Sequence, residues 1–170
     1  MNTEINSPSP EISSEKLETL ISQKVAKQNI PLAILGGFIS CLVGASLWAG
    51  ITVYSGYQIG WMAVGVGFLV GVSVRYFGKG VSLKFGFIGG GFALLACLLG
   101  NLFSIIGFIS VEEGLNFFQT MLAINYAVIP EIMISTFNPI DLLFYGFALY
   151  GGYQYSFTQL SDSEVQSVME

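Results

Sequence analysis

Four long apolar stretches alternate with polar connections along the chain. They occupy residues 32–54, 59–77, 85–110 and 140–157, and the only charged residues inside them are Arg75 and Asp141, each close to an end. At about 1.5 Å per helical residue, such stretches extend roughly 27 to 39 Å, which matches a hydrocarbon core of about 30 Å. The pattern predicts an all-α integral membrane bundle of four transmembrane helices, with the transmembrane domain covering 31–157.

The more polar residues outside these four stretches predict two tails and one interfacial segment. Residues 1–14 contain Pro8 and Pro10 and indicate a disordered tail, and 158–170 form an acidic C-terminal tail. Between the third and fourth stretches, the apolar part of 113–137, residues 115–129, would extend only about 22 Å as a helix, which is short for a crossing, so 113–137 indicates a segment in the outer interface. If 115–129 crosses instead, the C-terminus moves to the opposite side of the membrane.

Residues 15–30 predict an amphipathic helix, because Leu17, Leu20, Ile21 and Val25 recur at helical spacing among polar residues. Such a helix either docks a partner or lies on the membrane surface before the first crossing. The second interpretation is favoured, since the helix leads directly into an apolar stretch.

Small residues recur along one side of each apolar stretch, often at every fourth position. This spacing lets two helix backbones approach closely within a membrane. The predicted helix-packing residues are Gly36, Gly44, Ala63, Gly67, Gly71, Gly89, Ala93, Ala148 and Gly152.

Two asparagines predict local structure. Asn101 is the one strongly polar residue within 85–110, and we expect it to form a hydrogen-bonded joint between helices more readily than a substrate site. Asn138 precedes Pro139 and Asp141, which is typical of a helix start with Asn as the N-cap.

The composition argues against most catalytic and metal-binding sites. The chain is 53% hydrophobic and 10% charged and contains no His, so the commonest general base and metal ligand is missing. Cys41 and Cys97 fall deep in apolar stretches and are interpreted as packing residues. Carboxylates such as Glu131 near the outer face could bind a cation or serve an enzyme, but solvation and helix-dipole complementarity explain the same residues and are the favoured interpretation. We therefore expect no enzyme, metal, cofactor or nucleic-acid partner.

The positive charges predict the orientation. All six cations lie either before the first apolar stretch or between the second and third, namely Lys16, Lys24, Lys27, Arg75, Lys79 and Lys84. Four crossings place these segments on one side, and the positive-inside rule makes that side cytoplasmic, with both termini. The predicted location is the cell membrane, and the lipid bilayer is the first partner.

The strings GASLWAGITVYSGYQIGWMAVGVGFLVG and FNPIDLLFYGFALYGGYQYSF, with the GKG turn between them, resemble small bacterial multi-pass membrane proteins of four helices. The resemblance implies fold and location but no activity and no site residue. The similar strings CLVG and CLLG hint at a duplicated helical hairpin. The expected function is a non-enzymatic assembly or scaffold component that contacts itself or another membrane protein; the alternative is a small transporter or pore subunit with a polar path from Ser40, Thr52, Ser73, Asn101 and Ser104.

Overall fold

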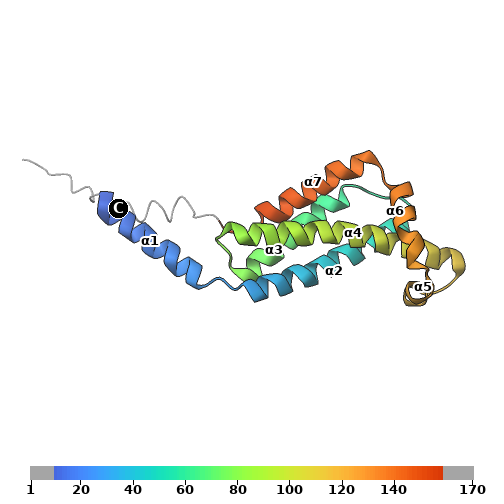
Figure 1. Cartoon of the computed structure of the whole chain (residues 1–170), viewed down its shortest axis with the longest axis horizontal. Helices are drawn as coiled ribbons and strands as arrows, with labels where there is room; N and C mark the ends of the chain where they lie inside the picture. Colours follow the sequence, from blue (N-terminus) through green and yellow to red (C-terminus); the bar gives the residue numbers. More distant parts are fainter. Residues whose placement is uncertain (1–9, 159–170) are drawn as a thin grey trace, which may run out of the picture.

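The computed structural model describes residues 10–158, and all regular structure in that range is helical. The elements are α1 (Pro10–Ala26), α2 (Ile30–Ser55), α3 (Met62–Gly78), α4 (Leu83–Glu113), α5 (Phe117–Ala123), the 3₁₀ turn η1 (Tyr126–Val128), α6 (Ile129–Thr136) and α7 (Pro139–Gln154). Figure 1 shows α2, α3, α4 and α7 lying side by side, with α5 and α6 at one end and α1 extending from the other.

The four long helices are arranged around a central pair. Helices α3 and α4 contact each other, and both contact α2 and α7, whereas α2 and α7 do not meet within the described residues. The contacts Trp48 with Gly100 and Val53 with Gly107 make α2 parallel to α4. Helix α3 is likewise parallel to α7, because Gly67 lies against Ala148 and Gly71 against Gly151. Two parallel pairs are the arrangement that a duplicated hairpin would give.

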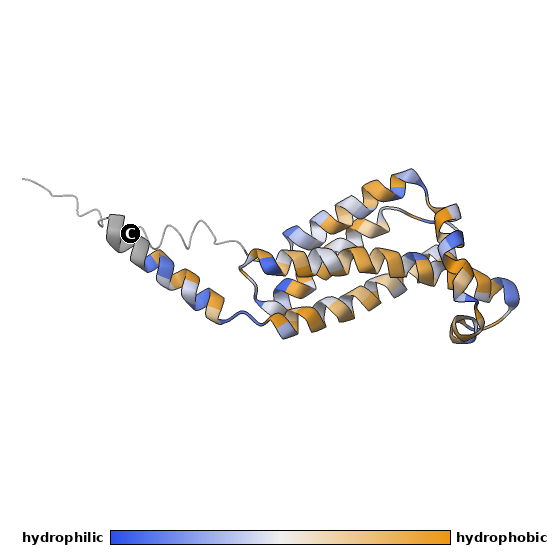
Figure 2. Cartoon of the chain, viewed as in Figure 1, coloured by the Kyte–Doolittle hydropathy of each residue, from blue (hydrophilic) through white to orange (hydrophobic). Residues whose placement is uncertain are grey.

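Two described helices, α2 and α4, are long and apolar enough to cross a membrane. The chain from α5 to α6 provides a third candidate only if it counts as one span, and it is bent by 86°. Helix α3 is apolar but has only 17 residues. The protein is therefore a helical protein with two or three candidate membrane spans, and Figure 2 shows apolar residues along the bundle and more polar ones on α1.

Capping residues set several helix ends. The Asn29 side chain accepts a hydrogen bond from the Leu32 N–H at 3.0 Å at the start of α2, and Gly56, with φ of 71°, ends this helix in the left-handed conformation. At the start of α7, Asn138 accepts from the Ile140 N–H, and Asp141 accepts from the Asn138 N–H at 2.9 Å. The predicted cap at Asn138 is confirmed.

Several predicted boundaries differ from the observed ones. Helix α1 begins at Pro10, within the predicted disordered tail 1–14, because the first turn of a helix does not require the N–H that proline lacks. Residues 1–9 and all but the first of 158–170 lie outside the described residues. Helix α3 begins at Met62 instead of residue 59, since the connection after α2 continues through a turn, and α4 extends to Glu113.

The turn between α3 and α4 is tight for a reason the sequence did not reveal. Lys79, with φ of 48°, takes the left-handed conformation, although a glycine lies on each side of it. A Cβ on Gly78 would lie 2.6 Å from the Ala33 Cβ and from a ring carbon of Phe85. Gly78 is therefore required for space between helices, and the conformational strain falls on Lys79.

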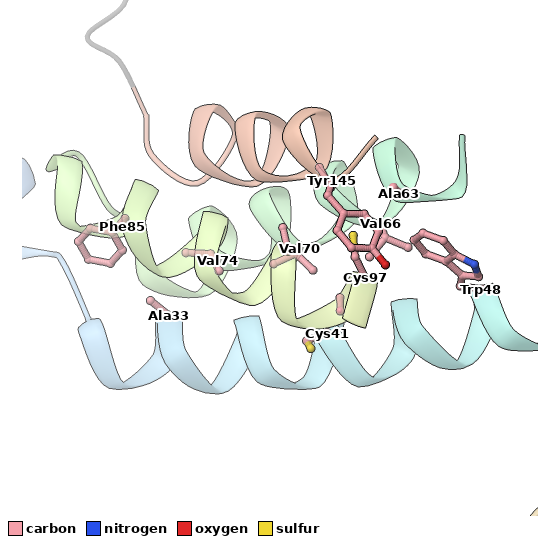
Figure 3. Packing of buried hydrophobic residues seen from close by; sticks show 13 residues of the cluster. Ala33, Cys41, Trp48, Ala63, Val66, Val70, Val74, Phe85, Cys97 and Tyr145 are labelled. Carbon is pink, nitrogen blue, oxygen red and sulfur yellow. The ribbon is translucent and has the colours of Figure 1, made fainter. Parts of the chain in front are cut away.

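The core of the bundle is built from small and medium-sized side chains. Trp48, Phe85, Ile106, Val70 and Val74 are its largest fully buried apolar side chains. Figure 3 shows Tyr145 pointing from α7 toward the cluster that contains Trp48, Val70 and Val74. The many small residues around them allow the helix backbones to approach closely.

Candidate functional site: a polar joint framed by small residues

The contact between α3 and α7 places backbone directly against backbone. A Cβ added to Gly67 would lie 2.5 Å from the Ala148 carbonyl oxygen and 2.7 Å from the Ala148 Cα. A Cβ on Gly71 would lie 3.0 Å from the Gly151 carbonyl oxygen. Backbone atoms cannot rotate away, so these glycines determine how closely the two helices approach.

The contact between α4 and α7 has the same character. A Cβ on Gly152 would lie 2.5 Å from the Ala93 Cβ and 2.7 Å from the Gly89 carbonyl oxygen. On the other side, Gly89 faces Gly152 and the Ser156 hydroxyl, which donates to the Gly152 carbonyl. Small residues on α3 and α4 thus hold α7 from two sides.

The remaining predicted packing residues lie between α2 and α3. Gly36 contacts the Phe77 ring, Gly44 contacts Val66, and Ala63 is fully buried in the core. All nine predicted packing residues are buried, and they serve contacts within this chain. These small-residue faces are therefore occupied internally, and a partner helix would need a different surface.

Asn101 lies where α4, α7 and the connection between α2 and α3 meet. Its side-chain amide donates to the Tyr145 hydroxyl of α7, and its carbonyl oxygen accepts from the Gln58 side chain at 2.8 Å. Three segments far apart in the sequence are thus joined through one side chain. The arrangement is that of a polar joint, and we name Gln58, Asn101 and Tyr145 the polar joint.

A cavity of about 200 Å³ adjoins the polar joint. The polar joint and Thr136 supply its polar lining, and its apolar lining is Leu98, Met133, Ile134 and Phe137. Phe137 also contacts the Tyr145 ring at 6.3 Å between centroids. Neutral donors and acceptors facing apolar walls suit water or a small uncharged polar molecule better than an ion.

Gln58 and Tyr145 were not identified from the sequence as partners of Asn101. Gln58 is the one side-chain amide in the connection after α2, and Tyr145 is the one phenol in the first half of α7. These two features of the sequence are what could have pointed to Gln58 and Tyr145 as partners of Asn101. A pairing across about 43 residues nevertheless depends on how the helices pack, which a single sequence does not specify.

The other titratable and thiol side chains of the described residues have local structural roles. No group of three or more His, Cys, Asp and Glu residues that could hold a metal occurs in the part of the chain that the structure describes. Cys41 and Cys97 are fully buried free thiols, and Asp141 is engaged in its capping hydrogen bond. The local roles of these residues leave the polar joint as the candidate site.

No protein-family model, curated protein or solved structure matches this chain. The resemblance to small bacterial multi-pass proteins stays a prediction.

Proposed function

We propose that α2, α3, α4 and α7 all cross the membrane, so that the protein is a four-crossing bundle. Support comes from the outward side chains of α7, where Leu142, Leu143 and Phe147 are exposed by 68%, 55% and 47%. Phe68 on α3 is 51% exposed as well. Soluble proteins rarely expose apolar surface of this extent, whereas lipid covers it without cost.

In this arrangement the turn from Lys79 to Lys84 and both chain termini lie in the cytoplasm. Arg75, Lys79 and Lys84 are exposed at the end of the bundle from which α1 extends (Figure 1). Glu112, Glu113 and Glu131 are exposed around the opposite end. The charge asymmetry supports this orientation through the positive-inside rule.

Within the membrane, we infer that the protein is a non-enzymatic component that assembles with itself or with another membrane protein. The observation that carries this proposal is an open groove of about 380 Å³ between α4 and α7. Gly91 and Gly146 line it, and a Cβ on either would meet no atom within 4 Å. No contact within the chain requires glycine at these two positions, in contrast to Gly67 and Gly89. Their lack of a side chain leaves room for another helix.

Leucine substitutions test the assembly proposal. Gly91→Leu and Gly146→Leu should leave the fold intact and reduce the assembled fraction in native mass spectrometry after gentle detergent extraction. Gly65→Leu on α3 is the matched control, because a Cβ there also meets nothing within 4 Å but lies outside the groove. Equal assembly by wild type, groove variants and control would contradict the proposal.

A transporter or pore subunit is the second candidate, and the cavity at the polar joint favours it. A continuous polar path is less well supported, because the hydroxyls of Ser40, Ser73 and Ser104 donate to carbonyls of their own helices. Only Thr52, among the five residues proposed for that path, has a buried hydroxyl without a partner. Solute flux in liposomes containing the pure protein, lost on Asn101→Leu, would favour this candidate.

A further inference from the structure

The cavity beside the polar joint is lined by hydrogen-bonding groups that the chain does not use. The Tyr145 oxygen accepts a hydrogen bond from the Asn101 side-chain amide, and the Asn101 side-chain oxygen accepts one from Gln58. Within the described residues, the Tyr145 O–H donates to no acceptor, and the Gln58 side-chain oxygen accepts from no donor. The lining of the cavity therefore contains one unused donor and one unused acceptor.

Tyr145 is the more buried of these two residues. It is 9% exposed, and the Phe137 ring packs against its ring with 6.3 Å between the centroids. Gln58, in contrast, is exposed. Buried polar groups usually have hydrogen-bond partners, so the Tyr145 O–H indicates an occupant of the cavity that supplies an acceptor.

The remaining lining restricts the size and the charge of that occupant. The cavity volume of about 200 Å³ equals that of about six water molecules at roughly 30 Å³ each. Among the described residues that line the cavity none is charged, and four are apolar: Leu98, Met133, Ile134 and Phe137. An ion would lose its hydration here without gaining a counter-charge, and water alone would leave the apolar walls wet. A small, uncharged molecule with one polar and one apolar part suits both kinds of wall.

Helix α6 forms a wall of the cavity that can move without disturbing the bundle. It has eight residues, and among the described elements it contacts only η1 and α4. Figure 1 shows α6 at the end of the bundle opposite α1. A ligand can therefore enter beside α6 while the four long helices stay in contact.

We propose that this cavity binds a small primary amide. The amide oxygen accepts a hydrogen bond from the Tyr145 O–H, the amide N–H donates to the Gln58 side-chain oxygen, and a short alkyl chain lies against the apolar walls. A primary amide supplies the acceptor and the donor that complement the unused pair, whereas a carboxylate of the same size supplies acceptors only. The inference rests on the second candidate function, to which it adds a substrate class, and it is independent of the assembly proposal.

Titration of the full-length protein in detergent micelles with propanamide and with propanoate tests this inference. The two molecules have the same number of non-hydrogen atoms, but only propanamide is uncharged and has an N–H. Binding is followed through the NMR signals of the Gln58 and Asn101 side-chain amides. Propanamide should shift these signals saturably, and propanoate should bind more weakly by about tenfold or more, because its charge has no counter-charge in the cavity.

Two variants remove one partner of the amide each. Tyr145→Phe removes only the hydroxyl and should weaken propanamide binding by about fivefold, the effect of one hydrogen bond. Gln58→Met should weaken it to a similar extent, and it changes an exposed residue outside the core, so the test does not depend on one buried substitution. Tyr150→Phe is the matched control, because Tyr150 is a phenol of α7 that does not line the cavity.

Three outcomes would overturn the inference: no saturable shift with propanamide, equal affinity for propanamide and propanoate, or equal affinity in wild type, Tyr145→Phe and Gln58→Met. Propanamide flux in liposomes separates this inference from the transporter proposal. Saturable binding without flux would support the amide site and refute transport. Flux of propanamide without binding at the polar joint would overturn the inference and place the route elsewhere.

Discussion

Alanine at Gly67 should leave the protein less stable than alanine at Gly65, although the two residues lie on the same helix. At Gly67 the new Cβ would lie 2.5 Å from the Ala148 carbonyl oxygen, whereas ordinary contact begins near 3.4 Å. Helix α7 must therefore move by about 1 Å, and overpacking of this kind costs about 1–3 kcal/mol. At Gly65 a Cβ meets nothing within 4 Å.

The comparison isolates the packing contribution to the free energy of unfolding. Replacing Gly by Ala in a helix interior favours the helix by up to about 1 kcal/mol, and this gain is common to both positions. Gly65→Ala should be neutral or stabilising, and Gly67→Ala should be less stable than Gly65→Ala by about 1–3 kcal/mol. Gly67→Leu should disrupt the contact more strongly, because leucine places three further carbon atoms beside a Cβ that already meets the Ala148 backbone.

Reversible unfolding in mixed detergent micelles measures both variants on the same scale. Separation of α7 from α3 can be followed independently by fluorescence from labels placed on the two helices. If Gly65→Ala and Gly67→Ala have equal free energies of unfolding, close backbone contact between α3 and α7 does not stabilise the protein and the packing argument is refuted.

Three further predictions concern single groups. Asn101→Leu should destabilise the fold by about 1–2 kcal/mol, and a double-mutant cycle with Tyr145→Phe should give a coupling free energy of about 0.6 kcal/mol in micelle unfolding; additive effects would contradict the hydrogen bond between them. Asn138→Ala should cost about 1 kcal/mol and speed amide exchange at the start of α7, and unchanged exchange there would show that the cap contributes nothing. Cys41 and Cys97 should react with maleimide only after denaturation, because both are fully buried, and rapid labelling of the native protein would contradict the core packing.

Local patterns predicted the parts of the structure that depend on a few neighbouring residues. The cap at Asn138 and the glycine-rich character of the helix faces could be inferred from spacing, because each follows from rules that operate within a helical turn. The partner of each face could not be inferred, since Gly67 and Gly91 look alike in sequence. Only the packing shows that Gly67 contacts Ala148 while Gly91 is open.

The candidate site also depends on helix packing that the sequence does not specify. Asn101 stood out because a strongly polar residue is unusual in an apolar stretch, but its partners Gln58 and Tyr145 come from a connection and from another helix. The left-handed conformation of Lys79 could not be inferred either, because glycines on both sides of it adopt that conformation more readily. The close contacts of Gly78 with Ala33 and Phe85 are likewise a tertiary property that the sequence does not reveal.

Cysteine labelling with a membrane-impermeant maleimide in intact cells tests the central claim of four crossings most directly. Single cysteines are placed at Lys79, Ser135 and Ser161, while the native cysteines are buried. The account predicts labelling of Ser135→Cys in intact cells, and labelling of Lys79→Cys and Ser161→Cys only after the membrane is permeabilised. Labelling of Ser161→Cys or Lys79→Cys in intact cells would contradict it.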